Sequence, residues 1–204
     1  QISVAQGETL PLTQEEVSFN GHSIEARLYA EKPSRGFLPA TGKVELWSPA
    51  EGLNIRIDDG INAGQNISPF YDPMLAKIIC SGSDRETARK RLVSALKETA
   101  LFGISTNREF LIDCLEKETF VDGNATTRFI SEEFEGDSFE KHRPTFKHVA
   151  IASVIELLFD YRKHHQSSVL VSPELKDWTN VGALASRKYY QFDEVIYDLH
   201  VSSI

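Results

Sequence analysis

The chain of 204 residues has little cysteine and no long apolar stretch. Cys80 and Cys114 are its only cysteines, without CxxC spacing or a Cys/His cluster, so we expect neither a disulfide framework nor a zinc site. No apolar run approaches the roughly 20 residues that a membrane-spanning helix requires, and residues 1–14 lack the design of a signal peptide. We therefore expect no membrane partner.

An excess of positive charge is also missing, since the formal net charge is −8 at pH 7. Such a chain has no net attraction for nucleic acid or for an anionic membrane surface. The phosphate-loop pattern GxxxxGK(S/T), the dinucleotide pattern GxGxxG and the nucleophile pattern GxSxG are all absent. Motifs alone therefore do not indicate a complete enzyme, although 41% apolar residues are enough for a packed core.

Extended segments dominate the first 82 residues. Asn20-Gly21 separates two extended stretches, which predicts a hairpin whose second arm is residues 22–30. Further extended segments are expected at residues 43–48, 53–67 and 73–80. Together they predict an antiparallel or mixed, meander-like sheet.

Helical signals follow the strands. Ser83 and Glu86 form a capping-box pattern, and a stripe with helical spacing predicts a helix that continues to Gly103. The members of this stripe are Ala88, Leu92, Ala95, Leu96 and Thr99. Thr106 and Glu109 repeat the capping box for a second helix. Strands first and helices after predict an α+β fold class, with helices packed on the sheet.

A charged segment divides the chain. Residues 135–147 have few aliphatic side chains and contain Pro144, which suits a linker between a domain at residues 1–134 and part of another at residues 148–204. Apolar positions from 148 to 165 cover most of a helix circumference, so we expect a helix buried on nearly all sides. SSVLVS and YYQFDEVIYDLHV are the strands that would begin to cover it. The missing cover, together with the absence of an initiating Met, indicates a fragment.

The strand at residues 22–30 has two different faces. Alternation places apolar residues on one face and Glu25, Arg27 and Tyr29 on the other. A guanidinium stays protonated at every working pH, so Arg27 either pairs with a carboxylate or binds an anion. An exposed salt bridge with Glu25 and an oxyanion-binding site are both compatible with this pattern.

Other polar residues are weaker candidates. Asp72 lies between Tyr71 and Pro73 just before an apolar strand, where a carboxylate either orients an arginine or only makes a turn. His22, beside the predicted turn, is more typical of a structural histidine than of a catalytic base. Residues 58–60, DDG, favour a turn, because a hard cation needs more oxygen ligands than this stretch offers. We therefore expect no metal site in this chain.

Five segments follow one another along the chain: GHSIEARLYAE, FLPATGKV, SPFYDPMLAKII, TNREFL and ATTRFI. In this order and spacing they resemble the C-terminal subdomain of biotin carboxylase, which also occurs in the α subunits of acyl-CoA carboxylases. The resemblance covers about residues 1–134, two thirds of the chain. Within the family, FLPATGKVELW and YDPMLAKI are most similar to the bacterial methylcrotonyl-CoA and geranyl-CoA carboxylases.

The resemblance implies roles for site residues. In this family the strand GHxxExR supplies an arginine to the carboxylation centre, and that arginine corresponds to Arg27, beside Glu25. The family reaction uses ATP, Mg²⁺ and bicarbonate to carboxylate biotin, and the arginine stabilises negative charge on the ureido oxygen. The family's Tyr-Asp pair corresponds to Tyr71 and Asp72, and Asp72 would hold Arg27.

The resemblance also implies partners. The ATP-binding region of the family lies upstream of this segment and the biotin-carrying Met-Lys-Met hairpin is absent, so we expect no cofactor to bind this chain alone. Residues 148–204 resemble the start of the barrel-like interaction domain that joins biotin carboxylase to the carboxyltransferase β subunit. Leu53 and Arg56 would lie at a biotin carboxylase dimer contact, where Leu53 replaces an aromatic residue of some relatives. The compartment would be a bacterial cytoplasm or a mitochondrial matrix.

Competing hypotheses therefore remain. In the first, the chain is part of a biotin-dependent carboxylase, inactive alone, with the biotinyl domain as a further partner. Residues 1–134 then form the Arg-bearing wall of the biotin carboxylase site, and the rest belong to an assembly domain. In the second, it is a non-catalytic interaction and assembly module in which Arg27 and Glu25 only form a salt bridge. A third is an intact small domain with another function.

Overall fold

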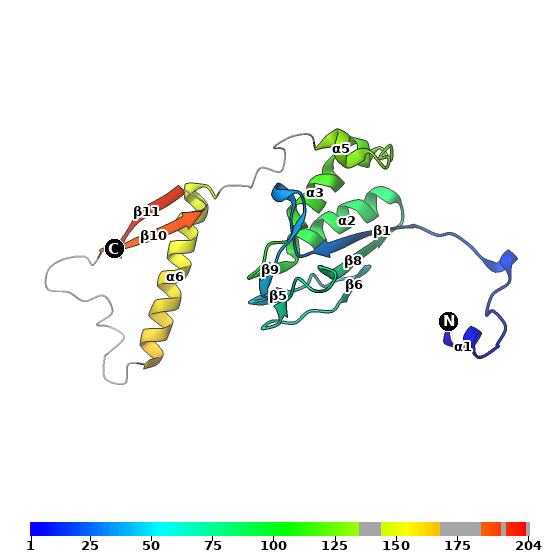
Figure 1. Cartoon of the computed structure of the whole chain (residues 1–204), viewed down its shortest axis with the longest axis horizontal. Coiled ribbons are helices and arrows are strands. Elements are labelled where there is room, and N and C mark those ends of the chain that lie inside the picture. Colours follow the sequence, from blue (N-terminus) through cyan, green and yellow to red (C-terminus); the bar gives the residue numbers. More distant parts are fainter. Residues whose placement is uncertain (135–143, 168–184, 193–194, 203–204) are drawn as a thin grey trace. The chain divides into compact units, whose positions relative to one another are not determined.

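The computed structural model describes residues 1–134, 144–167, 185–192 and 195–202 (Figure 1). The chain divides into two compact units, Gln1–Glu140 and Lys141–Ile204. Within the described residues, none of the helices combines the length and the apolar character that crossing a bilayer requires.

A three-stranded antiparallel sheet forms the centre of the first unit. Strands β1 (His22–Tyr29) and β6 (Ile55–Asp59) lie on either side of β8 (Met74–Gly82). This order is not a meander, because the central strand is the last of the three in the sequence. The predicted hairpin at Asn20-Gly21 is wrong: no strand precedes β1, which pairs instead with β8. The longer, apolar β8 offers eight paired positions, whereas Val17 and Phe19 ahead of the turn are exposed.

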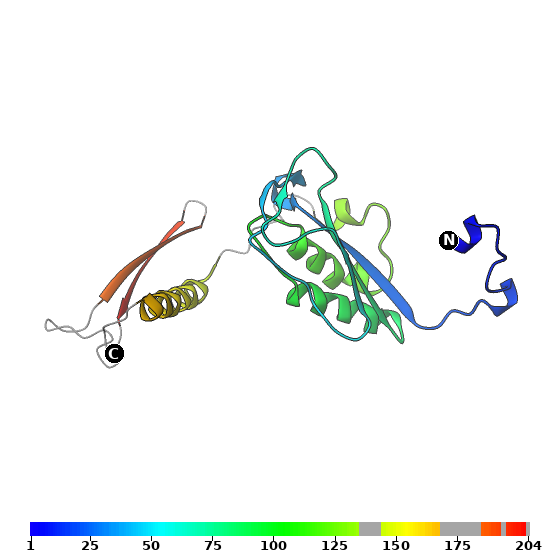
Figure 2. The same ribbon diagram turned by 90° about the horizontal axis from the view of Figure 1, so that it is seen from below.

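Helix α2 (Arg85–Glu98) covers one face of this sheet, so the strands lie in front of the helices when the first unit is seen from below (Figure 2). The predicted stripe on this helix is confirmed, because all five of its members are fully buried. Three of them, Leu92, Ala95 and Leu96, share a core cluster with Ala26, Ile78 and Cys80 of the sheet and with Ile112 and Leu115 of α3 (Arg108–Glu116). Burial of each such leucine or isoleucine stabilises the fold by about 1.5–3 kcal/mol.

The ends of α2 differ from the prediction. Asp84, not Ser83, caps the helix, since its carboxylate accepts a hydrogen bond from the Thr87 backbone N–H at 2.8 Å. The Ser83 hydroxyl donates to Asp84 instead. The helix ends at Glu98 and not at Gly103, because the intervening residues form strand β9 (Ala100–Phe102). Asn107 is the N-cap residue of α3.

The remaining strands of the first unit form two-stranded antiparallel pairs. These pairs are β2 (Glu31–Lys32) with β3 (Leu38–Pro39), β4 (Gly42–Lys43) with β7 (Asn66–Ile67), and β5 (Leu46–Ser48) with β9. Short helical turns complete the unit: α1 (Ile2–Ala5), η1 (Gln14–Glu16), η2 (Pro33–Arg35), α4 (Glu118–Val121) and α5 (Phe129–Glu133). The predicted α+β class with antiparallel sheets and packed helices is thus confirmed.

The second unit contains α6 (Phe146–Ser167) and a hairpin of β10 (Ala185–Phe192) and β11 (Val195–Ser202). Lys188 and Tyr190 of the hairpin bond to Glu156 of the helix at 2.9 and 2.6 Å. The sequence predicts that the residues following α6 are too few to wrap it completely, and within the described residues the helix is only partly covered. Its exposed apolar side chains include Ile151, Val154, Ile155, Leu158 and Phe159. Of the predicted strand SSVLVS, residues 168–172 lie outside the described residues.

A buried arginine connects α2 with the end of α3. Arg89 is buried, and its Nε and Nη2 donate to the Glu86 carboxylate at 2.7 and 2.8 Å while its Nη1 donates to the Leu115 carbonyl at 2.9 Å. The hydrogen bonds from Arg89 lower the pKa of Glu86 from 4.5 to about 2. The folded state therefore favours the charged form of Glu86.

We expect Glu86→Gln to remove part of the acid sensitivity of the fold. Because the folded-state pKa of Glu86 is depressed, its contribution is present above pH 4.5 and is lost as the pH falls towards about 2. Denaturant unfolding of the 204-residue chain at pH values from 2 to 6 measures this. Glu98→Gln, at the other end of α2, should keep the loss of unfolding free energy at acid pH. If both variants reduced this loss equally, its assignment to Glu86 would be wrong.

A second prediction concerns Gly82, at the end of β8. A Cβ atom there would lie 2.7 Å from the Ala88 backbone nitrogen and 2.8 Å from the Thr87 Cβ, both in the first turns of α2. Gly82→Ala should therefore lower the free energy of unfolding by about 1–3 kcal/mol through overpacking. Gly60→Ala is the control, because no atom lies within 4 Å of its added Cβ. Equal effects in thermal unfolding would show that the close approach of β8 and α2 is unimportant.

Candidate functional site

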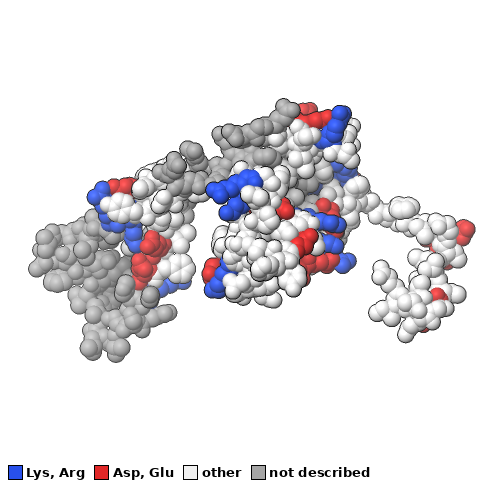
Figure 3. Space-filling view, viewed as in Figure 1, with Lys and Arg blue, Asp and Glu red and all other residues white. Residues whose placement is uncertain are grey.

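The sheet face opposite α2 carries charged side chains on all three strands. Glu25, Arg27 and Tyr29 lie along β1, and the register places Arg27 opposite Lys77 of β8, which lies opposite Asp58 of β6. Space-filling atoms of both charge signs intermingle on the visible surface of the first unit (Figure 3). The alternation predicted for residues 22–30 is confirmed on the other face, where Ala26 and Leu28 are buried.

Arg27 is held by its neighbour on the same strand. Its Nε donates to Glu25 Oε1 at 3.1 Å, and its side chain is 57% exposed. Hydrogen bonds with Glu25 and, secondarily, Tyr29 raise the pKa of Arg27 further. A guanidinium has five N–H donors, so these bonds leave donors for an anionic ligand.

A second arginine pairs in the same way on β6. Arg56 donates two hydrogen bonds to Asp58, each 2.9 Å long. These bonds are the main reason that the pKa of Asp58 is lowered. The two residues predicted at a dimer contact are both exposed: Leu53 by 86% and the Arg56 side chain by 73%. The dimer contact itself stays a prediction.

Asp72 forms a turn. Its Oδ1 accepts a hydrogen bond from the Met74 backbone N–H at 2.8 Å, which is the turn geometry considered as an alternative from the sequence. The loop reaches the end of β1, because the Pro73 carbonyl accepts from the Ala30 N–H at 2.8 Å. Among the described contacts, the carboxylate that accepts a hydrogen bond from Arg27 belongs to Glu25. A contact between Arg27 and Asp72 stays a prediction.

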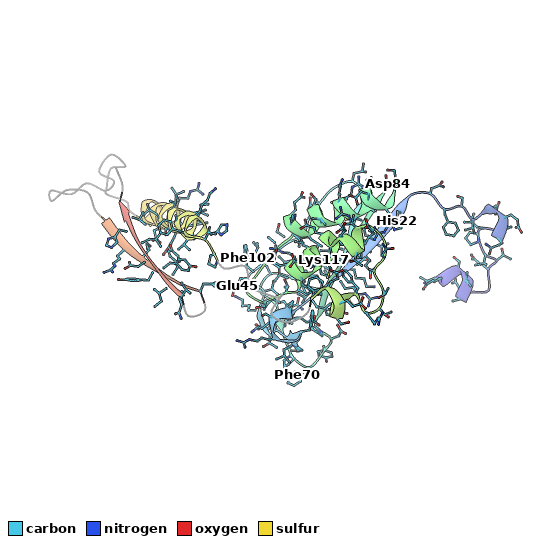
Figure 4. The ribbon with its side chains drawn as sticks, turned by 90° about the horizontal axis from the view of Figure 1, so that it is seen from above. His22, Glu45, Phe70, Asp84, Phe102 and Lys117 are labelled. Atoms are coloured by element: carbon cyan, nitrogen blue, oxygen red, sulfur yellow. The ribbon has the colours of Figure 1, made fainter. Side chains whose placement is uncertain are left out.

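The aromatic tip of this loop points away from the core. Tyr71 is 84% exposed, and Phe70 lies at the outer edge of the first unit (Figure 4). The predicted roles of Tyr71 and Asp72 therefore concern side chains of an exposed loop.

Asn107 is a site residue that the sequence reasoning missed. It is 5% exposed, and its side chain reaches the backbone of β1 on both sides of Leu28. Its Nδ2 donates to the Arg27 carbonyl at 3.2 Å and its Oδ1 accepts from the Tyr29 N–H at 2.9 Å. The segment TNREFL contains this residue, but no local spacing signals a bond to a strand about 80 residues away.

Other candidate chemistry finds little support in the described part of the chain. No group of three or more His, Cys, Asp or Glu side chains is placed there to hold a metal ion. His22 is exposed at the start of β1 (Figure 4), and Asp59 accepts a hydrogen bond from Trp47 Nε1 at 2.6 Å. Burial raises the pKa of the Cys114 thiol to about 12 and that of Cys80 in the same direction, so neither is suited to act as a nucleophile.

Comparison with known families identifies the fold of this site. The family model of the biotin carboxylase C-terminal domain matches residues 25–132, more than half of the chain, from Glu25 to beyond Asn107. This chain belongs to the biotin carboxylase C-terminal domain family. The resemblance inferred from the five sequence segments is thereby confirmed.

Relatives of this biotin carboxylase C-terminal domain come from several carboxylases. Biotin carboxylase 1 of Bacillus subtilis is 43% identical over 130 residues, 64% of this chain and 29% of the relative. Pyruvate carboxylase of Aspergillus terreus is 46% identical over 136 residues, 65% of this chain and 11% of the relative. The mitochondrial methylcrotonoyl-CoA carboxylase subunit alpha of Arabidopsis thaliana is 40% identical over 156 residues, 76% of this chain and 21% of the relative.

A solved structure agrees with these sequence relationships. The biotin carboxylase domain dimer of 2-oxoglutarate carboxylase from Hydrogenobacter thermophilus, in complex with MgADP, ADP and bicarbonate, matches with a TM-score of 0.66 and 36% identity. The match covers 70% of this chain and 31% of that chain. This biotin carboxylase C-terminal domain therefore spans less than a third of the relatives described above.

The two interpretations of Asp72 lead to different stabilities. If the carboxylate only accepts from the Met74 N–H, Asp72→Asn keeps an acceptor oxygen and should unfold within about 0.5 kcal/mol of the parent chain, whereas Asp72→Ala should lose about 0.5–1.5 kcal/mol. Denaturant unfolding of both variants measures the difference. Equal destabilisation by both variants would instead indicate that the charge of Asp72 matters, as a contact with a cation requires.

Proposed function

We propose that this chain is a segment of the biotin carboxylase subunit of a biotin-dependent acyl-CoA carboxylase, with residues 1–134 as one wall of the carboxylation site. The observation that carries the proposal is the exposed Arg27 guanidinium, held by Glu25 on the sheet face that α2 leaves uncovered. The family membership supports it, and a relative of known structure is a biotin carboxylase domain in complex with bicarbonate and MgADP.

The chemistry gives Arg27 a defined task. Carboxylation removes the proton from a ureido nitrogen of biotin, and negative charge then develops on the ureido oxygen. A guanidinium that is already in place donates hydrogen bonds to such an oxygen, or to bicarbonate, without the cost of reorganising solvent. Glu25 restricts its orientation through Nε. Because a guanidinium is not deprotonated at working pH, Arg27 stabilises charge and does not act as acid or base.

The remaining parts of the reaction belong to the rest of such an enzyme. ATP, Mg²⁺ and the biotin carrier would be held by regions outside this segment, so the segment alone would be inactive. Its partners would be the biotinyl domain, the carboxyltransferase β subunit and, through Leu53 and Arg56, a second biotin carboxylase. The exposure of these two side chains supports the last contact.

The length of one alignment supports an acyl-CoA carboxylase over other carboxylases. The alignment with the methylcrotonoyl-CoA carboxylase subunit of Arabidopsis covers 76% of the chain, whereas that with the Aspergillus terreus pyruvate carboxylase covers 65%. We assign residues 148–204, after a linker at 135–147, to the start of the interaction domain. Methylcrotonyl-CoA or geranyl-CoA would be the acyl substrate of the holoenzyme, in a bacterial cytoplasm or a mitochondrial matrix.

An assembly module without catalytic function is the alternative. Its support is that Arg27 and Arg56 each pair with a carboxylate two residues away, as exposed ion pairs do on surfaces without any reaction. In that case the charged face would serve only for contacts with other domains.

Arg27→Ala in the intact enzyme separates the two functions. We expect kcat for biotin-dependent ATP cleavage with bicarbonate to fall by about 10²–10³, because a donor to the developing charge is lost. The thermal midpoint should hardly change, since an exposed ion pair contributes about 0–1 kcal/mol. Arg128→Ala is the matched control, because Arg128 Nε forms an equally long, exposed bond of 3.1 Å, to Glu132. Turnover within twofold of the parent together with weakened assembly would favour the assembly module.

A further inference from the structure

We propose that Asn107 is a positioning residue that sets the place of the Arg27 guanidinium by holding the free edge of β1. This inference rests on the proposed function of Arg27. It adds a residue that touches neither substrate nor cofactor and acts only through the strand that carries the arginine.

The first support is the set of hydrogen bonds between Asn107 and β1. The side-chain carboxamide donates to the Arg27 carbonyl at 3.2 Å and accepts from the Tyr29 N–H at 2.9 Å, and the Asn107 backbone N–H donates to the Tyr29 carbonyl at 3.2 Å. These are the bonds that a neighbouring strand would make. Since β1 is the outer strand of its sheet, Asn107 takes the place of a missing strand at these two residues.

The second support is a weak point in the ladder at the same place. The pairing of β1 with β8 shifts between Leu28 and Tyr29, where Leu28 lies opposite Ala76 but Tyr29 lies opposite Met74. A register shift of this kind disrupts the ladder locally and bends the strand. One edge of β1 therefore pairs irregularly with β8 at Leu28 and Tyr29, and Asn107 bonds to the opposite edge of β1 at the same place.

The third support is the rigidity of the anchor. Asn107 is the N-cap residue of α3, and its carbonyl accepts from the Leu111 N–H at 3.0 Å. Phe110, Ile112 and Leu115 of this helix are buried, so the helix start is fixed by the core. Because the carboxamide is attached to this fixed helix start, its hydrogen bond holds the Arg27 backbone in a fixed place relative to the core.

The choice of asparagine follows from these partners. The site presents one acceptor, the Arg27 carbonyl, and one donor, the Tyr29 N–H, and a carboxamide offers the complementary donor and acceptor in one plane. An ionised aspartate has no donor, so it would place a carboxylate against the Arg27 carbonyl. A shift of the guanidinium by about 1 Å is enough to cost up to about 10²-fold in rate.

The test uses the intact biotin-dependent enzyme with Asn107→Ser, which removes the planar amide, and Asn107→Asp, which keeps only the acceptor for the Tyr29 N–H. We expect folded variants in which kcat for biotin-dependent ATP cleavage with bicarbonate falls about tenfold to a hundredfold while the KM for ATP stays the same. In an Arg27→Ala background, the same substitution should cost less than about twofold, because two residues that act through one guanidinium are not additive.

Thr99→Val is the matched control. Thr99 is likewise a buried polar side chain with two hydrogen bonds, from the Ala50 N–H at 3.2 Å and to the Ala95 carbonyl at 2.8 Å, but it lies at the end of α2. Its loss should lower the thermal midpoint and leave kcat unchanged. A fall in kcat equal to that of Asn107→Ser would show that any damage to the core has this effect and would overturn the proposal.

Three further outcomes would also overturn it. Turnover of the folded Asn107 variants within twofold of the parent would leave Arg27 with its proposed function and remove only the role of Asn107. Equal loss in the presence and absence of the Arg27 side chain would show a purely structural role. Full activity of Arg27→Ala alone would refute the proposed function of Arg27, and the role of Asn107 with it.

Discussion

The packing of α2 on one face of the β1-β8-β6 sheet determines where the charged groups of the first unit lie. Ala26, Ile78 and Cys80 bury themselves against this helix, and alternation along the strands then leaves the opposite face to Arg27, Lys77 and their neighbours. A shift of any strand by one residue would exchange the two faces. The hydrophobic effect thus orients a guanidinium that takes no part in the core itself.

The ion pairs on the charged face contribute little to stability, so the stability of the fold does not by itself account for their arrangement. Exposed ion pairs contribute about 0–1 kcal/mol, and Arg27 with Glu25 and Arg56 with Asp58 are pairs of this kind. By contrast, the buried Arg89 pairs with Glu86 within α2 through two hydrogen bonds and joins this helix to α3 through a third, to the Leu115 carbonyl. The same residue types thus serve the fold where they are buried and remain available for an anion where they are exposed.

Sequence patterns correctly predicted the elements that have an internal periodicity. They failed where the structure of a segment depends on a partner that is distant in the sequence. The buried stripe of α2 and the alternation of β1 follow from spacing alone, and both are confirmed. The hairpin at Asn20-Gly21 was wrong because a turn signal is local, whereas the partner of β1 lies about 50 residues further along. Asp84 replaced Ser83 as the cap of α2, because both residues can cap and only the start of the helix chooses between them.

By itself, the sequence determined which residues share a face, which segments resemble biotin carboxylase, and that Arg27 stands beside Glu25 on a polar side of its strand. Only the tertiary structure decided that Glu25 bonds to the guanidinium, that Asp72 closes a turn, and that Asn107 bonds to β1. The physical reason is the distance along the chain between the residues that interact. Periodicity records which way a side chain points relative to its own element, whereas hydrogen-bond partners depend on how elements far apart in the chain pack against one another.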